Sequence, residues 1–300
     1  MTSLAAPVLR RLDRASMQPH LGSLSAWLLP GSIYGVQHTW PQLYRSDGDG
    51  RFLTLFLGDR LLAHCAFRIV TLRTGRGPRR IALLGSVATD PAERGRGHAS
   101  RLLAHAIADC RTLGADAILL WAEQPNLYAR LGFMPSRPEV CVCIAAQDSA
   151  PSLAHEHTSV RRAAITDHAT LARLHADKPT AVERDLRTMS GLLTTPGMAT
   201  MVLERAGLVI AYACMGKGAD LQSWWHECGG EDRAVAALMP AAMAQLGQPE
   251  AFVLVPPYRR DLPSLLAPVT LDRAIVAGPM VLPLVPDFAP DAWIDGLDSV

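Results

Sequence analysis

The chain has 300 residues, with 29 basic and 28 acidic side chains and six cysteines. This length fits two ordinary domains, and the 49% hydrophobic and 19% charged fractions exclude a chain that is disordered by composition. The net charge of +1 argues against a general nucleic-acid binder, which needs a basic excess. We therefore expect a folded protein with a sizeable core and no nucleic-acid partner.

The sequence predicts neither a secretory leader nor a membrane span. The first 16 residues carry charged side chains, and they contain no apolar run that ends in a cleavage site. The longest uncharged stretch, 17–44, is broken by three prolines and three glycines, so it is a poor spanning helix. The cysteines form no CxxC pair, which favours buried free thiols in a reducing compartment. We therefore expect a cytoplasmic protein without a membrane partner.

The first half of the chain predicts alternating strands and helices. Residues 51–57 and 61–72 form a hairpin around the turn at 58–60. From Ala99 to Cys110, apolar residues recur at i, i+3, i+4, i+7, i+8 and i+11, which is one stripe of an amphipathic helix. The other predicted elements are a strand over 81–89, a short buried strand over 117–121, a turn or short helix over 125–131, and a last strand near 140–144.

Apolar periodicity lapses near residues 147–158, where turn-forming residues accumulate. We therefore divide the chain into two domains, residues 1–148 and 158–300. The second repeats the order of the first in weaker form. Its predicted elements are a helix from Thr166, a hairpin over 201–204 and 208–215, a strand over 221–226, a helix over 234–246 that Pro240 interrupts, and a strand over 252–255.

The segment Val87-Ala-Thr-Asp-Pro-Ala-Glu-Arg94-Gly-Arg-Gly-His-Ala-Ser100 has the properties of an anion cradle. A buried strand leads into a loop with Gly95 and Gly97, and an amphipathic helix starts directly afterwards. The first N–H groups of a helix have no internal partner, and the helix dipole places partial positive charge at that end. Glycines let the backbone approach an anion closely. The pattern therefore predicts a phosphate or pyrophosphate site.

This segment resembles the acetyl-CoA loop of the GCN5-related N-acetyltransferase (GNAT) family, whose pattern is Arg/Gln-x-x-Gly-x-Gly/Ala. Arg94, Gly97 and Ala99 match that pattern. A second match, Leu127-Tyr-Ala-Arg-Leu-Gly-Phe133, resembles the family's Leu-Tyr-x-x-Leu-Gly-Phe segment. The resemblance implies two tandem α/β (α+β) domains, each with a mixed, mostly antiparallel sheet flanked by helices. It also implies the acetyl-CoA-binding residues Val87, Ala88, Thr89, Arg94, Gly95, Arg96, Gly97, His98, Ala99, Ser100 and Asn126.

The resemblance implies direct attack of an amine on the thioester carbonyl of acetyl-CoA. The tyrosine of the Leu-Tyr segment commonly protonates the departing thiolate, and Tyr128 occupies its place. The base is Glu123, just past the buried strand, or Asp90 at the end of the preceding one. The acceptor is a small-molecule amine or a protein amine, and no metal is expected.

Two other functions are weighed against this one. A non-catalytic CoA-binding regulatory module would use the same cradle, with Tyr128 as a core aromatic. A nucleotide-dependent oxidoreductase would need a dinucleotide-binding G-x-G-x-x-G/A turn, but Ser100 stands at its third small position. The run Arg73–Arg80, which has four arginines and no acid, is a solvated hairpin end or a contact with CoA phosphate or with an acidic substrate.

The second half lacks both motifs. The place equivalent to the cradle reads Cys228-Gly-Gly-Glu-Asp-Arg233, and Glu231 and Asp232 would repel a pyrophosphate. No Leu-Tyr-x-x-Leu-Gly-Phe follows the strand ending at Val255. We therefore predict a degenerate copy without its own acetyl-CoA, which walls the substrate cleft or mediates dimerisation.

Overall fold

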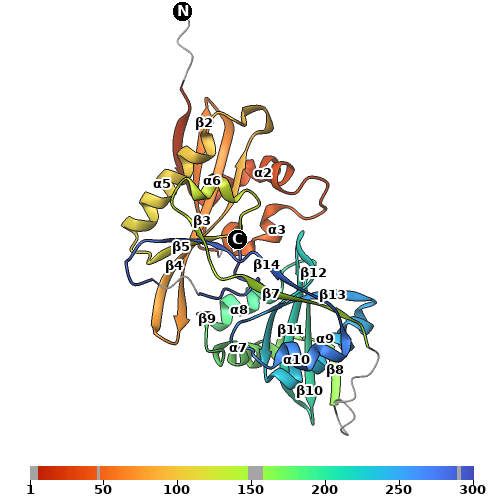
Figure 1. Ribbon diagram of the computed structural model, residues 1–300. Helices are drawn as coiled ribbons and strands as arrows, with labels where there is room; N and C mark the ends of the chain where they lie inside the picture. Colours follow the sequence, from red (N-terminus) through yellow and green to blue (C-terminus); the bar gives the residue numbers. More distant parts are fainter. Residues whose placement is uncertain (1–5, 46–47, 148–157, 289–291) are drawn as a thin grey trace, which may run out of the picture.

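The computed structural model describes residues 6–45, 48–147, 158–288 and 292–300. They form two mixed sheets of mostly antiparallel strands, each flanked by helices (Figure 1). Most of the expected boundary segment, 148–157, lies outside the described residues. Within the described ranges, no helix is both long enough and apolar enough to cross a bilayer.

The first sheet has the order β1-β2-β3-β4-β5-β15-β6, and the short strand β9 also pairs with β3. β4 and β5 run parallel, which the intervening helix allows, and the hairpins β2–β3 and β3–β4 are antiparallel. The strands are β1 (Val8–Leu12), β2 (Arg51–Leu57), β3 (Arg60–Thr74), β4 (Gly77–Thr89), β5 (Ala117–Leu120), β6 (Met134–Pro135), β9 (Ala181–Val182) and β15 (Met280–Pro283).

Helix α5 (His98–Thr112) packs on one face of this sheet, and its predicted apolar stripe from Leu102 to Cys110 is buried there. Gly114 follows it with a φ of 71°, a left-handed conformation that glycine adopts readily at the end of a helix. The opposite face is covered by α1 (Arg14–Met17), α2 (Leu21–Leu28), α3 (Val36–Thr39) and α4 (Pro41–Tyr44). The short α6 (Pro125–Ala129) follows β5.

The second sheet has the order β14-β7-β13-β12-β11-β10-β8. Helix α9 (Asp232–Leu246) packs on one face, and α7 (His168–Ala176) and α8 (Leu186–Leu193) pack on the other. The strands are β7 (Glu139–Ala145), β8 (Thr158–Arg162), β10 (Ala199–Arg205), β11 (Leu208–Lys217), β12 (Asp220–Gly230), β13 (Glu250–Val255) and β14 (Thr270–Val276), and α10 (Leu262–Leu266) follows β13.

The predicted interruption of the last long helix at Pro240 is wrong. α9 continues through this proline, because residues on both sides of it are buried against the second sheet. Proline removes one backbone donor from the helix, but the packing of nine buried residues of α9 outweighs that loss.

Two strands cross between the sheets. The strand near 140–144 was expected to complete the first sheet, but β7 lies between β13 and β14 of the second. In exchange, β15 from the end of the chain lies between β5 and β6 of the first. The hydrophobic pattern predicts such a strand but not its partner, since either sheet offers an equivalent place beside its parallel pair. Each sheet is therefore completed by the other half of the chain (Figure 1).

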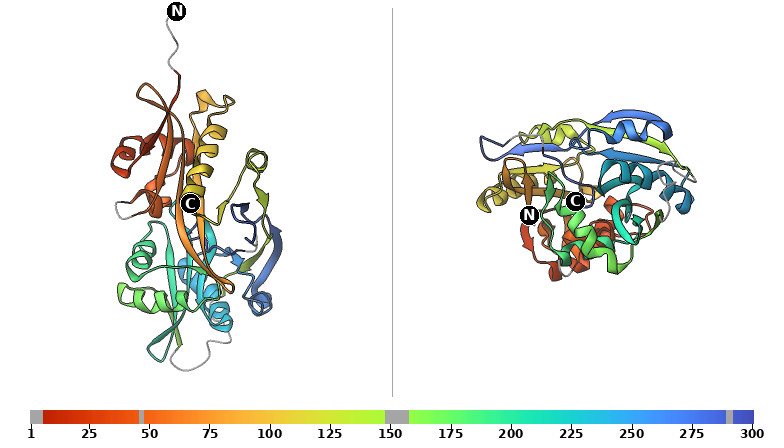
Figure 2. Two further views of the ribbon diagram at one scale, coloured as in Figure 1. Left: turned by 90° about the vertical axis from the view of Figure 1, so that its left-hand side faces the viewer. Right: turned by 90° about the horizontal axis from the view of Figure 1, so that it is seen from below.

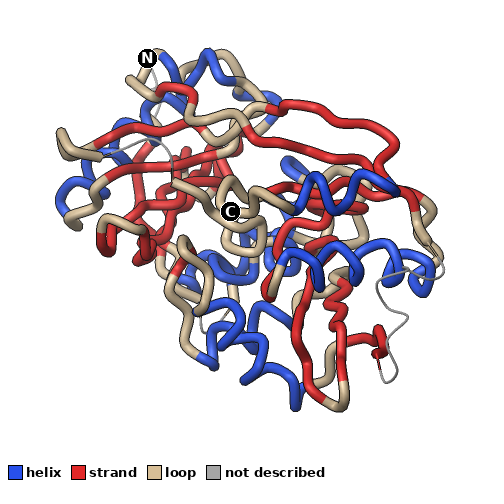
Figure 3. The backbone as a smooth tube through the Cα atoms, turned by 60° about the horizontal axis from the view of Figure 1, so that its bottom comes forward, coloured by secondary structure: helices blue, strands red, loops and turns tan. Residues whose placement is uncertain are grey.

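The last residues of the chain lie between the two sheets, as the views from several directions agree (Figures 1 and 2). They form a loop at the centre of the molecule (Figure 3). This placement was not predictable from the sequence, because the segment has no regular apolar periodicity.

Candidate functional site

The two parallel strands of the first sheet separate at their carboxyl ends. The register of β4 with β5 runs from Ile81↔Ala117 to Leu83↔Leu119, whereas β4 continues to Thr89. A bulge at Ser86, with a φ of 53°, shifts the pairing of β4 with β3 at the same level. Backbone groups of β4 beyond Leu83 therefore border an opening, and the predicted cofactor residues Val87, Ala88 and Thr89 lie along it.

Three side chains that the sequence analysis did not assign to the site support this bulge. Tyr44 Oη donates to Ser86 Oγ at 2.7 Å, and the ring of Tyr44 stacks on Phe52. His64 Nδ1 donates to the Ser86 carbonyl oxygen at 2.8 Å. Burial lowers the pKa of His64 to about 4, so the ring is neutral near pH 7. These contacts hold the strained residue in place.

The loop that the sequence predicts to be an anion cradle lies at the same end of β4. The loop contains a turn of 3-10 helix, η2 (Pro91–Glu93), followed by Gly95 and Gly97 with φ values of 78° and 77°. Gly97 is the N-cap of α5, so the first N–H groups of that helix point out of the loop. A Cβ added at either glycine would meet nothing within 4 Å, so the loop surface is open. These residues fit an anionic group.

The charges of the loop differ in one respect from the prediction. Arg96 is not free, because its Nη1 pairs with Glu93 Oε2 at 2.7 Å. Arg60 from β3 pairs with the same buried carboxylate, and the ring of His98 lies 3.8 Å from it. Glu93 therefore ties the loop to the sheet, a role that the sequence did not reveal. Arg94 is exposed and its Nε donates to the Thr89 carbonyl at 3.5 Å, so it adds positive charge at the loop.

Tyr128 is buried at the sheet end of α6. Its ring is 8% exposed and packs edge-on against Phe133, with 5.9 Å between the ring centroids. Burial raises the pKa of Tyr128 to about 12, and the charges of Cys65 and Glu123 act in the same direction. The phenol therefore keeps its proton at neutral pH, as a general acid must.

The predicted carboxylates and amide near Tyr128 are less constrained. Glu123 is exposed in the segment that joins β5 to α6, and Asn126 is exposed in the first turn of α6. Asp90 caps η2, where its Oδ1 accepts the N–H of Ala92 at 3.0 Å. Asp90 is thus already part of the loop structure, whereas the Glu123 carboxylate makes no such capping bond within the described part of the chain.

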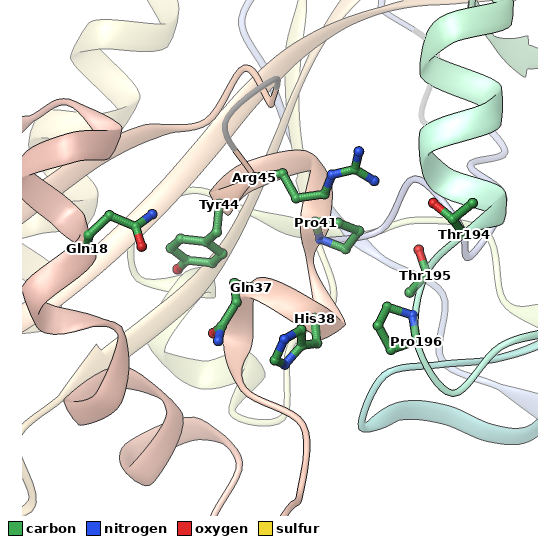
Figure 4. Close-up of a pocket in the computed structure, with 9 residues that line it drawn as sticks. All are labelled: Gln18, Gln37, His38, Pro41, Tyr44, Arg45, Thr194, Thr195 and Pro196. Carbon is green, nitrogen blue, oxygen red and sulfur yellow. The ribbon is translucent and has the colours of Figure 1, made fainter.

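A cavity of about 360 Å³ lies between the short helices of the first half and the second half (Figure 4). Tyr44, whose hydroxyl supports the β4 bulge, lies in its wall. Arg45 joins the two sides, since its Nη1 donates to the Gly191 carbonyl at 2.7 Å. The described residues of the lining are Gln18, Gln37, His38, Pro41, Tyr44, Arg45, Thr194, Thr195 and Pro196, and none of these is a carboxylate.

Two other places are less suited to the reaction. A cavity of about 480 Å³ borders Thr112 and Leu113, at the opposite end of α5 from the cradle. The arginine-rich hairpin end, 73–80, lies at the start of β4, about 40 Å of extended chain from Thr89. There Arg73 donates to the Lys178 carbonyl, and Arg79 pairs with Asp287. The interpretation of this run as a CoA contact is therefore not supported.

One group of described residues has a metal-like arrangement, formed by His175, Glu227 and Asp295. Lys178 Nζ already lies 2.9 Å from Asp295 and 3.6 Å from Glu227, and Arg184 pairs with Glu227 at 2.8 Å. Cationic side chains thus balance both carboxylates. The residues do not fit a metal ion, because its charge would compete with buried cations that are already in place.

The comparisons with known proteins agree with this geometry. Residues 30–136 match the family model described as the acetyltransferase (GNAT) domain. No curated protein matches. Among solved structures, a probable N-acyltransferase from Enterococcus faecalis V583 superimposes with a TM-score of 0.72 at 12% identity, covering 93% of this chain and 73% of that one.

Two further structures share the fold. A GCN5-related N-acetyltransferase from Kribbella flavida has a TM-score of 0.67 at 18% identity, covering 93% of this chain and 71% of that one. A tandem GNAT protein from the clavulanic acid biosynthesis pathway has a TM-score of 0.57 at 11% identity, covering 94% of this chain and 100% of that one. Residues 30–136 of this chain thus match the GNAT domain model, and the chain as a whole has the fold of a tandem GNAT protein. The dinucleotide-binding alternative does not fit these mostly antiparallel sheets.

Proposed function

We propose that the protein transfers an acetyl group from acetyl-CoA to a primary amine by direct attack, at a site in the first sheet. The observation that carries this proposal is the coincidence of two features at one end of β4. The strand separates from β5 there, and the loop with left-handed Gly95 and Gly97 leads directly into α5. The extended arm of acetyl-CoA and the anionic end of the same molecule would therefore bind next to each other.

The donor side uses mainly backbone groups. Val87, Ala88 and Thr89 present N–H and C=O groups along the opening, and the N–H groups from His98 to Ser100 face the anion. Arg94 adds positive charge. Acetyl-CoA, when bound, supplies the thioester that the amine attacks.

Tyr128 is the proposed acid, since its raised pKa keeps the phenol protonated until a thiolate of the leaving CoA accepts the proton. Glu123 and Asp90 are the two candidates for the base. The capping role of Asp90 favours Glu123, because the Asp90 carboxylate is already held by the N–H of Ala92.

The acceptor site is proposed to be the cavity between α3, α4 and residues Thr194–Pro196 (Figure 4). Its volume of about 360 Å³ suits a small molecule. Among the described lining residues, a polycation would find no carboxylate, whereas His38 and Gln37 offer hydrogen-bond partners to hydroxyl or carboxylate groups. The favoured acceptor is therefore a small amine whose remaining groups are neutral or anionic.

The test is thiol release from acetyl-CoA with a panel of amines of graded charge: amino acids, amino sugars and polyamines. Turnover with the first two classes supports both parts of the proposal. Turnover with polyamines alone contradicts the assignment of the acceptor. CoA binding without thiol release across the panel favours the regulatory-module alternative, provided that an intact acetyl-CoA complex is verified by mass spectrometry.

A further inference from the structure

The second sheet contains an opening like the one in the first. β12 pairs in parallel with β13 only at Trp224↔Phe252 and Trp225↔Val253, although β12 continues to Gly230. Its register with β11 also shifts at this level, between Cys214 and Met215. The opening therefore begins at His226, the residue after the last parallel pair, just as the first opening begins after Leu83.

Part of the chain itself lies in this second opening. The C-terminal segment, defined as Trp293–Val300, places Gly296 against β12, and the Gly296 N–H donates to the His226 carbonyl at 3.0 Å. A Cβ on Gly296 would come within 2.7 Å of His226 Cβ, so the backbone approach is close. Leu297 and Asp298 are fully buried. The segment thus runs where the corresponding opening of the first sheet would receive the arm of the cofactor.

Buried charges hold the segment in this place. Lys178 Nζ pairs with Asp295 at 2.9 Å, and Arg184 Nη2 pairs with Asp298 at 2.6 Å. Lys217 Nζ donates to the Gly296 carbonyl at 2.9 Å. Lys178 and Lys217 are the only lysines of the chain, so both of them bind this segment. Removing one partner of such a pair leaves an unpaired buried charge, which is strongly destabilising locally.

The second half also has no room for a cradle. Eight residues, 90–97, separate β4 from α5, but Glu231 alone separates β12 from α9. Arg259 Nη1 donates to the Gly230 carbonyl at 2.9 Å and pairs with Asp232 at 2.6 Å, so the start of α9 is already occupied. This half thus retains the opening but has lost the anion site next to it.

The far end of the segment reaches the first opening. Gln42 of α4 donates from Nε2 to the Ser299 carbonyl at 2.6 Å. A Cβ on Gly85 would overlap the carbonyl group of Val300, so the end of the segment lies directly against β4, one residue before the Ser86 bulge. One stretch of eight residues therefore connects the two openings.

We propose that the C-terminal segment is an internal ligand of the second half, which fills the vestigial cofactor opening and is thereby positioned against the β4 bulge of the first. The degenerate half then acts as a holder that sets the position of Ser299 and Val300 beside the reacting groups. The positioning of Ser299 and Val300 beside the reacting groups rests on the proposed acetyl transfer. The filling of the second opening by the C-terminal segment does not.

Asp298→Asn tests the proposal on the full chain, because it removes one charge of the anchor and leaves Arg184 paired with Glu227. Asp177→Asn is the matched control, since this carboxylate is 66% exposed and lies on the same half. We expect hydrogen exchange of the 293–300 amides to be slow in the wild type and in the control, and at least 100-fold faster in Asp298→Asn. Exchange in α5 should not change.

The functional readouts separate positioning from folding. In Asp298→Asn, we expect the Kd of CoA to stay within twofold, with one CoA per chain, and kcat/KM for the amine to fall at least tenfold. Should the variant not fold, Gln42→Met releases the far end of the segment alone and should lower the same kcat/KM.

Three results would overturn the inference. Fast exchange of the wild-type segment, or binding of two CoA molecules per chain, contradicts the occupancy. Faster exchange of the 293–300 amides with an unchanged kcat/KM for the amine contradicts the proposal that the segment positions Ser299 and Val300. If the wild type acetylates no amine of the panel, the proposed function fails, and the exchange data still decide the occupancy.

Discussion

Gly97 offers the sharpest perturbation of the proposed cofactor site. It has a φ of 77° as the N-cap of α5, and a Cβ there would meet nothing within 4 Å. Alanine at this position therefore causes no clash, and its effect comes from the backbone. A left-handed conformation costs an L-residue about 1–2 kcal/mol, so the loop is expected to relax toward negative φ. That relaxation turns the N–H groups at the start of the helix away from their present directions.

The expected loss of affinity follows from those N–H groups. Hydrogen bonds to a charged partner contribute about 1.5–3 kcal/mol each, so losing two of them weakens CoA binding by about 100-fold or more. Isothermal titration with CoA measures the effect directly, without an amine acceptor. We expect Gly97→Ala to raise the Kd by that factor.

Gly114→Ala is the matched control. Gly114 has a φ of 71°, an equally open Cβ position and a place at the other end of the same helix. Both variants should lose similar stability, of about 1–2 kcal/mol, but only Gly97→Ala should lose CoA affinity. Equal CoA affinity in the two variants would refute the placement of the cradle, and an equal loss in both would attribute the effect to folding.

Three further predictions address the acid, the acceptor and the pH dependence. Tyr128→Phe should lower kcat by about 10²–10⁴-fold with an unchanged Kd for CoA, and wild-type turnover would remove Tyr128 from the acid role. Gln37→Glu places a carboxylate in the acceptor cavity, so KM for an anionic amine should rise while CoA affinity is constant; a KM that falls would contradict the charge argument. Burial lowers the pKa of both His64 and His226 from 6.5 to about 4, so their contribution to stability is complete above pH 6.5 and is lost as the pH falls toward 4. Each contributes on the order of 3 kcal/mol to that loss, and a free energy of unfolding that stays constant between pH 6.5 and 4 would be inconsistent with neutral, buried rings.

The two halves show how a duplicated fold can divide its tasks. In the first, an opening between parallel strands adjoins a glycine loop with excess positive charge. In the second, the opening persists, but Glu231 and Asp232 take the place of the loop and Arg259 covers the start of the helix. An opening without its anion site has little to offer a cofactor, and in this chain the C-terminal segment occupies it.

The exchange of β7 and β15 makes the two halves dependent on each other. Each strand is flanked on both sides by strands of the sheet that it joins, β7 by β13 and β14, and β15 by β5 and β6. Separating the halves would expose unpaired strand edges in both sheets. The division at residues 148–158 is therefore a division of the sequence. We do not expect either half to fold alone, and the proposed difference between the halves is a difference between their binding sites.

The sequence by itself determined the local elements and the cradle. The spacing of apolar residues along α5 and the hairpin of β2 and β3 depend on neighbours a few residues away, and Gly95 and Gly97 are needed by a backbone conformation that is local to the loop. These features could be predicted because they depend on short-range properties: the period of a helix, the residues that favour turns, and the left-handed φ that glycine adopts.

Only the tertiary structure decided which sheet receives β7 and β15, how Glu93 ties the loop to β3, and where the C-terminal segment lies. The cavity that we propose for the acceptor, too, exists only because Thr194–Pro196 approach α3 and α4. Each of these depends on partners more than 30 residues apart in sequence, as in the pairing of Arg60 with Glu93 or of Lys178 with Asp295. Strand edges and buried charges accept any partner of suitable geometry, so the choice is made by packing of the whole chain and leaves no periodic trace in the sequence.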